Sequence, residues 1–158
     1  MAYYLFNLII SILIWQSSSL SPENIQQKKE NENNNILLSA SGTCGPQLQF
    51  SITSGVLYIT GSGPMTNFTS SSRPWYNERS SITKVIISEN VLTIGNYAFY
   101  NFNNMVSITI PNSVKYIGTY AFNSCTNLLT IKLPEKITTI EPYCFRYCTK
   151  LMYFDIPY

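Results

Sequence analysis

Four cysteines, at positions 44, 125, 144 and 148, are the side chains with the widest chemical potential in this sequence. A thiolate can act as a nucleophile, close a disulfide or bind zinc. A cysteine or serine nucleophile that is activated by an imidazole base needs histidine, and so do many zinc sites. The chain contains no histidine. Cys144 and Cys148 form a single pair, with no second pair to complete four zinc ligands. The sequence therefore predicts no metal site and no nucleophile activated by an imidazole.

Carboxylates are the next candidates, because two of them can hydrolyse a glycosidic bond. Glu89 and Glu135 lie in predicted turns, where solvated charge is the default. None of the carboxylates beyond residue 40 falls in a periodic apolar row; they are Glu78, Glu89, Glu135, Glu141 and Asp155. The segment Gly61-Ser62-Gly63-Pro64 lacks the Gly-Lys-Thr/Ser that completes a phosphate loop, and a turn explains it. We predict no enzymatic activity, no cofactor and no small-molecule substrate.

One glycosylation sequon with a permitted middle residue occurs, at Asn67-Phe68-Thr69. It lies in a serine-rich stretch that could accommodate an oligosaccharide. Such three-residue matches are also common by chance, so both interpretations of Asn67 stay open.

The content of charged residues indicates whether the chain could bind nucleic acid. Ten Lys and Arg stand against eight Asp and Glu in 158 residues, a formal net charge of +2. A nucleic-acid binder needs a basic stripe, and these basic residues are scattered. Charged residues make up 11% of the chain and aromatic residues 14%, which favours a β-rich protein. No nucleic-acid partner is predicted.

The N-terminal third is predicted to lie outside the folded part. Residues 5–15 form an apolar run too short to span a bilayer but typical of a secretory signal, although no Lys or Arg precedes it. A retained anchor and a strand of the fold are the alternatives. Residues 21–35 are polar and rich in asparagine, which indicates a disordered linker. We predict a signal peptide over residues 1–20, a linker over 21–39 and an extracellular location, secreted or at the cell surface.

A repeat of 23 residues organises the chain from Ile82 onward, without a gap. The rows at this spacing are Ile82, Met105, Leu128 and Leu151; Val85, Ile108, Ile131 and Phe154; Ile87, Ile110, Leu133 and Ile156; Val91, Val114 and Ile137; Ile94, Ile117 and Ile140; Ala98, Ala121 and Cys144; and Phe99, Phe122 and Phe145.

Each repeat has a physical interpretation. The opening segment is rich in β-branched residues and ends at Pro111, Pro134 or Pro157, because proline has no N–H to give to a strand ladder. A second short segment follows, and then a helical or turn piece such as residues 120–122. One unit cannot cover its own apolar face, so successive units stack. The predicted fold is a repeat solenoid with a parallel β-sheet and a short helical or turn convex side, occupying residues 82–158.

The unit from Ile108 to Leu128 resembles the BspA-like leucine-rich-repeat family of surface proteins, in the pattern I-x-I-P-x-x-[VI]-x-x-I-G-x-x-A-F-x-x-C-x-x-L. The segments 41–45, 61–65 and 73–76 also resemble the N-terminal cap of that family. The resemblance implies a secreted or surface-displayed scaffold that adheres to host or matrix proteins. Arrays in the family are usually longer, and many members carry an anchor.

Residues 40–81 make independent sense as a small β cap. Leu48, Phe50 and Ile52 alternate with polar residues, and Thr53-Ser54-Gly55 signals a hairpin turn. This hairpin would cover the open face of the first repeat, as solenoids require. No comparable cap follows the partial fourth unit, whose bare edge suggests truncation or an end that meets a partner.

Cys125 and Cys148 occupy the same row of consecutive repeats. Neighbouring strands lie about 4.8 Å apart, within the range of about 4.4–6.8 Å between Cα atoms that a disulfide accepts. A disulfide between repeats is therefore geometrically feasible. The alternative, which we favour, is that both are free thiols packed as small hydrophobic groups.

The best candidates for binding are the outward positions of the first strand in each unit. Mixed polar positions with an exposed aliphatic and an aromatic residue suit protein recognition, although β-propensity alone would also explain them. These candidates are Lys84, Ile86, Ser107, Thr109, Thr130, Lys132, Tyr153 and Asp155.

The sequence supports two functional hypotheses. The first is a non-catalytic adhesion module that recognises a protein ligand on a cell or matrix surface. The second is an assembly role, in which the uncapped last unit stacks on another chain, or a fragment of a longer surface antigen.

Overall fold

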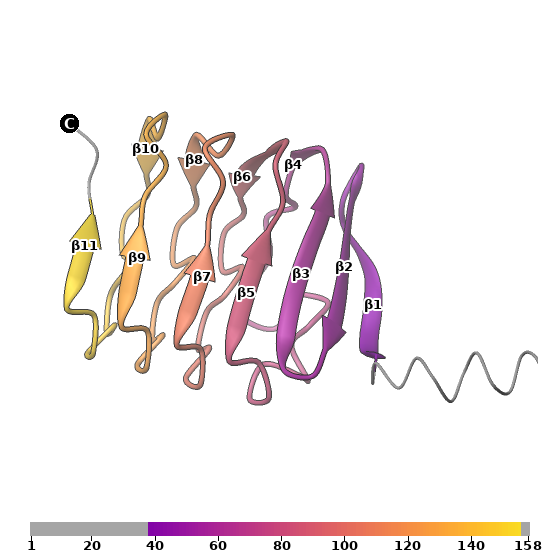
Figure 1. Ribbon diagram of the computed structural model, residues 1–158, viewed down its shortest axis with the longest axis horizontal. Helices are drawn as coiled ribbons and strands as arrows, with labels where there is room; N and C mark the ends of the chain where they lie inside the picture. The colour runs from indigo at the N-terminus through magenta and orange to yellow at the C-terminus, as the bar shows by residue number, and fades with distance from the viewer. Residues whose placement is uncertain (1–37, 156–158) are drawn as a thin grey trace, which may run out of the picture. The chain divides into compact units, whose positions relative to one another are not determined.

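The computed structural model describes residues 38–155. The predicted signal peptide, most of the predicted linker and residues 156–158 lie outside the described residues. Within residues 38–155 there are strands and no helix (Figure 1). In chain order the strands are β1 (Leu38–Gly45), β2 (Leu48–Thr53), β3 (Val56–Gly61), β4 (Gly63–Pro64), β5 (Lys84–Ile87), β6 (Val91–Ile94), β7 (Ser107–Thr109), β8 (Tyr116–Ile117), β9 (Thr130–Lys132), β10 (Thr139–Ile140) and β11 (Tyr153–Asp155).

The strands form three hydrogen-bonded sheets. Their orders are β1-β2-β3-β5-β7, β10-β8-β6-β4 and β11-β9. β1, β2 and β3 pair antiparallel, and every other pair is parallel. In β5 and β7, Val85 pairs with Ile108, 23 positions further along the chain. The predicted parallel sheet is therefore confirmed.

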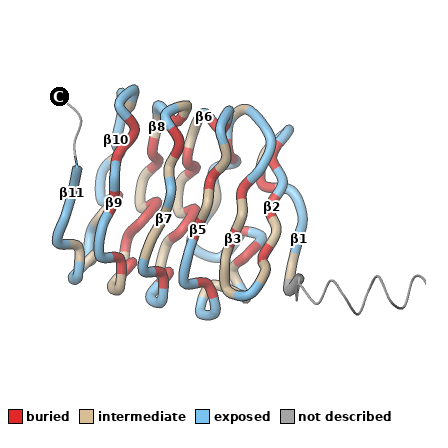
Figure 2. Tube along the Cα trace, viewed as in Figure 1, coloured by how far each residue is buried: buried red, intermediate tan, exposed pale blue. Residues whose placement is uncertain are grey.

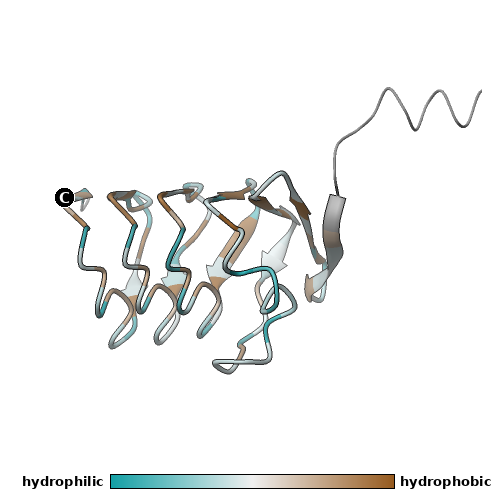
Figure 3. Cartoon of the chain, turned by 90° about the horizontal axis from the view of Figure 1, so that it is seen from below, coloured by the Kyte–Doolittle hydropathy of each residue, from teal (hydrophilic) through white to brown (hydrophobic). Residues whose placement is uncertain are grey.

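Local sequence explains why these segments are strands. β-Branched residues recur in β5 and β6, and apolar residues alternate with polar ones along β2, whose Leu48, Phe50 and Ile52 are buried. Buried side chains of β2, β3 and β5 follow the period-two alternation of the pleat and belong to a common core, and Figure 2 shows buried segments in most of the successive turns of the chain. Apolar segments recur at corresponding places in successive turns of the chain (Figure 3).

The side opposite the large sheet consists of tight turns. The sequence predicted either short helices or turns on this side, and over the described residues it is turns. Tyr97, Tyr120 and Tyr143 adopt left-handed backbone conformations, with φ of 55°, 58° and 62°. Left-handed φ is costly for a bulky residue. The amide of Phe99 donates to Ala121 O at 2.8 Å, and equivalent bonds join the later turns, which holds them in register.

Aromatic side chains form a column through the core. Trp75 stacks on Phe99 with ring centroids 6.0 Å apart, Phe99 on Phe122 at 5.3 Å, and Phe122 on Phe145 at 5.3 Å. Stacked pairs at such distances add to the free energy of burial. The column therefore joins the segment before β5 to the last repeat.

Two residues seal the junction between the N-terminal segment and the first repeat, which we call the Arg73–Trp75 junction. The indole Nε1 of Trp75 donates to Ala98 O at 2.8 Å. The Arg73 guanidinium is buried, donates to Ser70 O and Tyr100 O, and lies over three aromatic rings. Burial lowers the pKa of Arg73 to about 10, so it remains charged at neutral pH. Among residues 38–155, carbonyls and rings rather than a carboxylate surround this charge.

Candidate functional site

The eight predicted binding positions lie on four strands, two on each. Lys84 pairs with Ser107, and Ile86 with Thr109, across β5 and β7. Thr130 pairs with Tyr153, and Lys132 with Asp155, across β9 and β11. β9 lies beside β7, so the pairs form two columns across the strands (Figure 1). All eight side chains are exposed or half-buried. Their role in binding stays a prediction.

The columns continue into the N-terminal segment, which the sequence did not predict. Val56 of β3 pairs with Lys84, and Tyr58 pairs with Ile86. Tyr58 in turn pairs with Ser51 of β2. The alternation of residues 56–60 was the available signal, but the hairpin was expected to cover the end of the array instead of extending its sheet. We call the combined surface the outward face: Val56, Tyr58 and the eight predicted positions.

The outward face offers contacts for recognition. It carries two tyrosines, two aliphatic residues, three serine or threonine hydroxyl groups, two lysines and one carboxylate. Tyr153 is 68% exposed, and Tyr58 and Ile86 are half-buried. Aromatic anchors among adaptable polar groups are typical of protein-binding surfaces.

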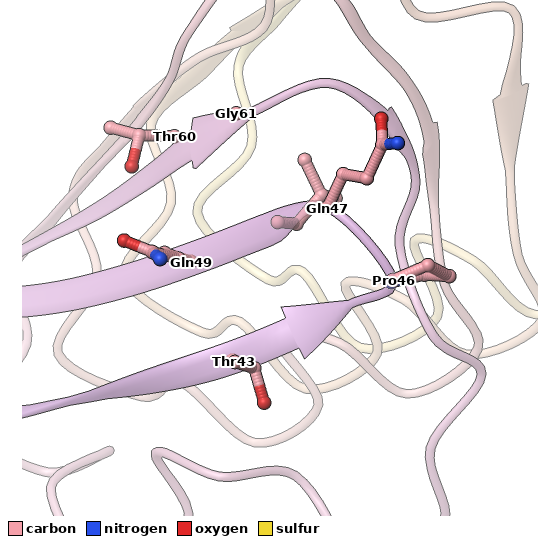
Figure 4. Close-up of a pocket in the computed structure, with 7 residues that line it drawn as sticks. Thr43, Pro46, Gln47, Gln49, Thr60 and Gly61 are labelled. Atoms are coloured by element: carbon pink, nitrogen blue, oxygen red, sulfur yellow. The ribbon is translucent and has the colours of Figure 1, made fainter.

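An open cavity of about 260 Å³ lies near the end of β1, β2 and β3 (Figure 4). Gln49 pairs with Thr43 on one side and with Thr60 on the other. Gln47 accepts a hydrogen bond from Ser62 Oγ at 2.9 Å, which fixes one amide of the lining. Small-molecule sites usually enclose about 300–1,000 Å³, so this cavity is small for that purpose. The lining residues are Thr43, Pro46, Gln47, Leu48, Gln49, Thr60 and Gly61.

All four cysteines are free thiols in the structure. Cys125 Sγ donates to Phe99 O at 3.2 Å, and Cys148 Sγ donates to Phe122 O at 3.1 Å, so the two thiols repeat one contact in consecutive turns. Burial raises the pKa of Cys44 and of Cys144 to about 12. Cys44 and Cys144 therefore behave as packed hydrophobic groups. Cys125 and Cys148 are among these free thiols, and a disulfide between them stays a prediction.

Asn67 has a structural contact of its own. Its Oδ1 accepts the amide N–H of Asn96 at 2.9 Å, and Asn96 Oδ1 accepts that of Thr119 at 2.9 Å. The two asparagines thus link successive turns of the chain. The bond of Asn67 uses Oδ1, whereas a glycan is attached at Nδ2, and the residue is exposed. Both interpretations of the sequon remain compatible with this geometry.

The remaining ionisable groups are dispersed. Glu89 and Glu135 are exposed in turns, where solvated charge was expected. Over residues 38–155 no three His, Cys, Asp or Glu side chains converge as metal ligands would. In the same range no helix could span a membrane.

Three solved structures resemble the chain. A leucine-rich repeat protein from Eubacterium ventriosum is 31% identical, with a TM-score of 0.51, over 54% of this chain and 24% of its own. One from Bacteroides ovatus is 28% identical, with a TM-score of 0.49, over 62% and 26%. One from T. pallidum is 22% identical, with a TM-score of 0.47, over 73% and 50%. The chain thus spans about a quarter of the length of the first two. The comparison with curated proteins found no match.

The family of the chain follows from a match to a family model. The BspA type leucine rich repeat region, in six copies, matches residues 71–158. This match covers 88 of the 158 residues, more than half of the chain. The parallel strands and the similarity to the E. ventriosum structure agree with it. The chain belongs to the BspA-type leucine-rich-repeat family.

Proposed function

We propose that this chain is a non-catalytic, secreted or cell-surface leucine-rich-repeat protein that adheres to a protein ligand through its outward face. One observation carries the proposal. The outward positions of β3, β5 and β7 are hydrogen-bonded neighbours in a single sheet, so their side chains stand side by side. A binding surface assembled in this way is broad and relatively flat, which suits a folded protein better than a small molecule.

The repeat solenoid is part of this proposal. Strand partners 23 positions apart in both β5–β7 and β9–β11 support a 23-residue unit, with a parallel sheet on one side and turns on the other. Each unit contacts chiefly its neighbours, as in other repeat arrays. In this arrangement the core makes the array rigid, and the residue types on the outward face can change without disturbing the core.

The extracellular location rests on the apolar run at residues 5–15, interpreted as a secretory signal. The domain boundaries at residues 20, 39 and 81 remain part of the same proposal. The proposed ligand is a protein on a cell or matrix surface. The scattered basic residues argue against a nucleic-acid ligand.

The experiment compares two substitutions of an aliphatic side chain by a charge. Ile86→Asp lies on the outward face, and Leu92→Asp lies on β6 of the other sheet, where Leu92 is 43% exposed. The full chain is labelled and its binding to intact epithelial cells and to an immobilised basement-membrane extract is titrated.

The proposal expects Ile86→Asp to weaken binding at least tenfold, and Leu92→Asp to bind like the original chain. Far-ultraviolet circular dichroism checks that both variants are folded. Equal losses in the two variants, or no binding by the unsubstituted chain to either surface, would contradict the proposal.

A further inference from the structure

Cys125 and Cys148 occupy the same place in two consecutive turns of the chain. Each follows a residue with a left-handed backbone, Ser124 with φ of 61° and Tyr147 with φ of 63°, so the backbone leads into both cysteines in the same way. The amide N–H of Ser124 donates to Arg146 O at 2.8 Å, which holds the two turns side by side at this point. The fold therefore brings the two thiols to neighbouring positions.

The contacts of the two sulfurs place them close to each other. Phe122 O accepts the amide N–H of Cys125 at 3.2 Å and the thiol of Cys148 at 3.1 Å. The Cys148 sulfur thus lies beside the backbone of Cys125. Cys125 Sγ makes the equivalent contact with Phe99 O at 3.2 Å. Because a thiol is a weak hydrogen-bond donor, little energy is lost when the two sulfurs turn toward each other.

The thiol of Cys148 differs from the packed thiols elsewhere in the chain. A side-chain hydrogen bond with Cys125 lowers the pKa of Cys148, although partial burial acts in the opposite direction. Burial raises the pKa of Cys44 and of Cys144 to about 12 instead. The thiolate is the form of cysteine that attacks a disulfide. Cys148 is therefore the most reactive of the four thiols, and Cys125 is the partner within its reach.

We propose that Cys125 and Cys148 are a dithiol that closes to a disulfide in an oxidising environment and joins two successive repeats covalently. The residues that bring the sulfurs together, from Phe99 to Cys148, lie inside the repeat array. The disulfide is independent of the ligand that the outward face binds. It shares with the proposed function only the extracellular location, where disulfides persist.

The oxidant in this reaction is a small disulfide such as oxidised glutathione. The Cys148 thiolate attacks one sulfur of glutathione disulfide, whose S–S bond breaks, and the released glutathione takes up the proton that Cys148 had lost. Cys125 then attacks the Cys148 sulfur of the mixed disulfide, and its proton goes to the second departing glutathione. Two cysteine thiols are oxidised to one disulfide, and one glutathione disulfide is reduced to two thiols.

Tryptic peptides make the pairing directly measurable, because trypsin separates the cysteines. Cys125 falls in residues 116–132, Cys144 in residues 137–146 and Cys148 in residues 147–150. The full chain is reduced, refolded in a mixture of reduced and oxidised glutathione, alkylated with iodoacetamide in denaturant and digested. Mass spectrometry is expected to find peptide 116–132 joined to peptide 147–150, with the remaining two cysteines alkylated.

Cys144→Ser is the matched control and should give the same joined peptides, whereas Cys148→Ser should abolish them. Recovery of peptide 147–150 in the alkylated form alone, or joined to peptide 137–146, would overturn the proposal. Neither result involves binding, so the proposed adhesion would stand or fall separately.

Thermal denaturation tests whether the disulfide holds the two repeats together. The oxidised chain is expected to unfold at a temperature several degrees above that of the reduced chain, because the bridge restricts the unfolded state. The double variant Cys125→Ala/Cys148→Ala should unfold at the same temperature under both conditions. An oxidised chain that carries the bridge but is no more stable than the reduced chain would refute the covalent support of the repeats.

Discussion

The two ends of the repeat array differ in how their first and last apolar rows are covered. At the N-terminal end, Trp75 stacks on Phe99 and both are fully buried. At the other end, Phe145 stacks on Phe122 but has no stacked ring beyond it among the described residues. The residue types are alike, so the difference arises from position. The apolar side chains of a repeat are buried when another repeat or the N-terminal segment packs on each side of it. A row of side chains therefore contributes fully to stability only when the next row packs against it.

The largest expected effect comes from removing Trp75, the aromatic side chain of the Arg73–Trp75 junction. Trp75→Ala removes a fully buried ring that touches Phe50, Phe68 and Phe99. We expect the free energy of unfolding to fall by about 3–5 kcal/mol, as for other large cavities. Guanidinium denaturation followed by circular dichroism measures it. Phe145→Ala is the control, because its half-buried ring should contribute less; an equal loss in both would show that the ends do not differ.

The second test uses one substitution in one row at two positions. Ile117→Ala creates a cavity between two turns and should cost about 2–5 kcal/mol of unfolding free energy. Ile140→Ala, at a side chain that is 38% exposed, should cost less than about 1.5 kcal/mol. Denaturation midpoints of the two variants give the comparison.

The dependence of stability on alkaline pH tests both ends of the array, because each end contains a buried thiol. Burial raises the pKa of Cys44, in β1, and of Cys144, in the last repeat, from 9.0 to about 12. Below pH 9 both thiols are protonated in the folded and unfolded chain, so their full contribution is present. Between pH 9 and about 12 the unfolded chain releases protons that the folded chain retains, and stability falls by up to about 1.4 kcal/mol per pH unit for each thiol.

Denaturation at a series of pH values measures that slope. Cys44→Ala and Cys144→Ala should each make the slope shallower by the contribution of one proton, which isolates the effect of each thiol. A slope unchanged in both variants would show that the thiols are accessible to solvent in the folded chain.

The smallest effect concerns backbone strain in the turns. Asn101, Ser124 and Tyr147 occupy equivalent left-handed positions, with φ of 60°, 61° and 63°. Asparagine adopts this conformation at a lower energetic cost than tyrosine does. Tyr147→Asn should therefore stabilise the last repeat by about 0.5 kcal/mol, after subtraction of the exposed contact with Arg146. Thermal denaturation would detect the rise, and Asn101→Tyr should show the opposite sign.

Much of the core could be predicted from the sequence because repetition shows which positions share an environment. Ile82, Met105 and Leu128 form one row in the sequence, and all three are buried. The junction could not be predicted in the same way, since it occurs once. Burial of Arg73 without a carboxylate partner depends on rings from separate turns converging on one guanidinium, and no spacing in the sequence indicates that.

The outward face illustrates the same limit. Alternation along each strand predicted which residues of β5, β7, β9 and β11 point away from the core. The inclusion of Val56 and Tyr58 depends on β3 pairing parallel with β5, a contact between two segments without periodic relation. Similarly, the left-handed tyrosines give no signal in their residue type, because tyrosine is not a residue that favours positive φ.

The Arg73–Trp75 junction has a consequence for acid tolerance. Its partners are backbone carbonyls, an indole N–H and aromatic rings, and none of these gains a proton as the surroundings become acidic. Interfaces that rely on carboxylates weaken when those groups are protonated, and histidine-based contacts change charge near pH 6.5. This chain has no histidine, and within residues 38–155 the partners of the Arg73 guanidinium are carbonyls and rings. In an acidified compartment the seal over the first repeat would keep every one of its bonds.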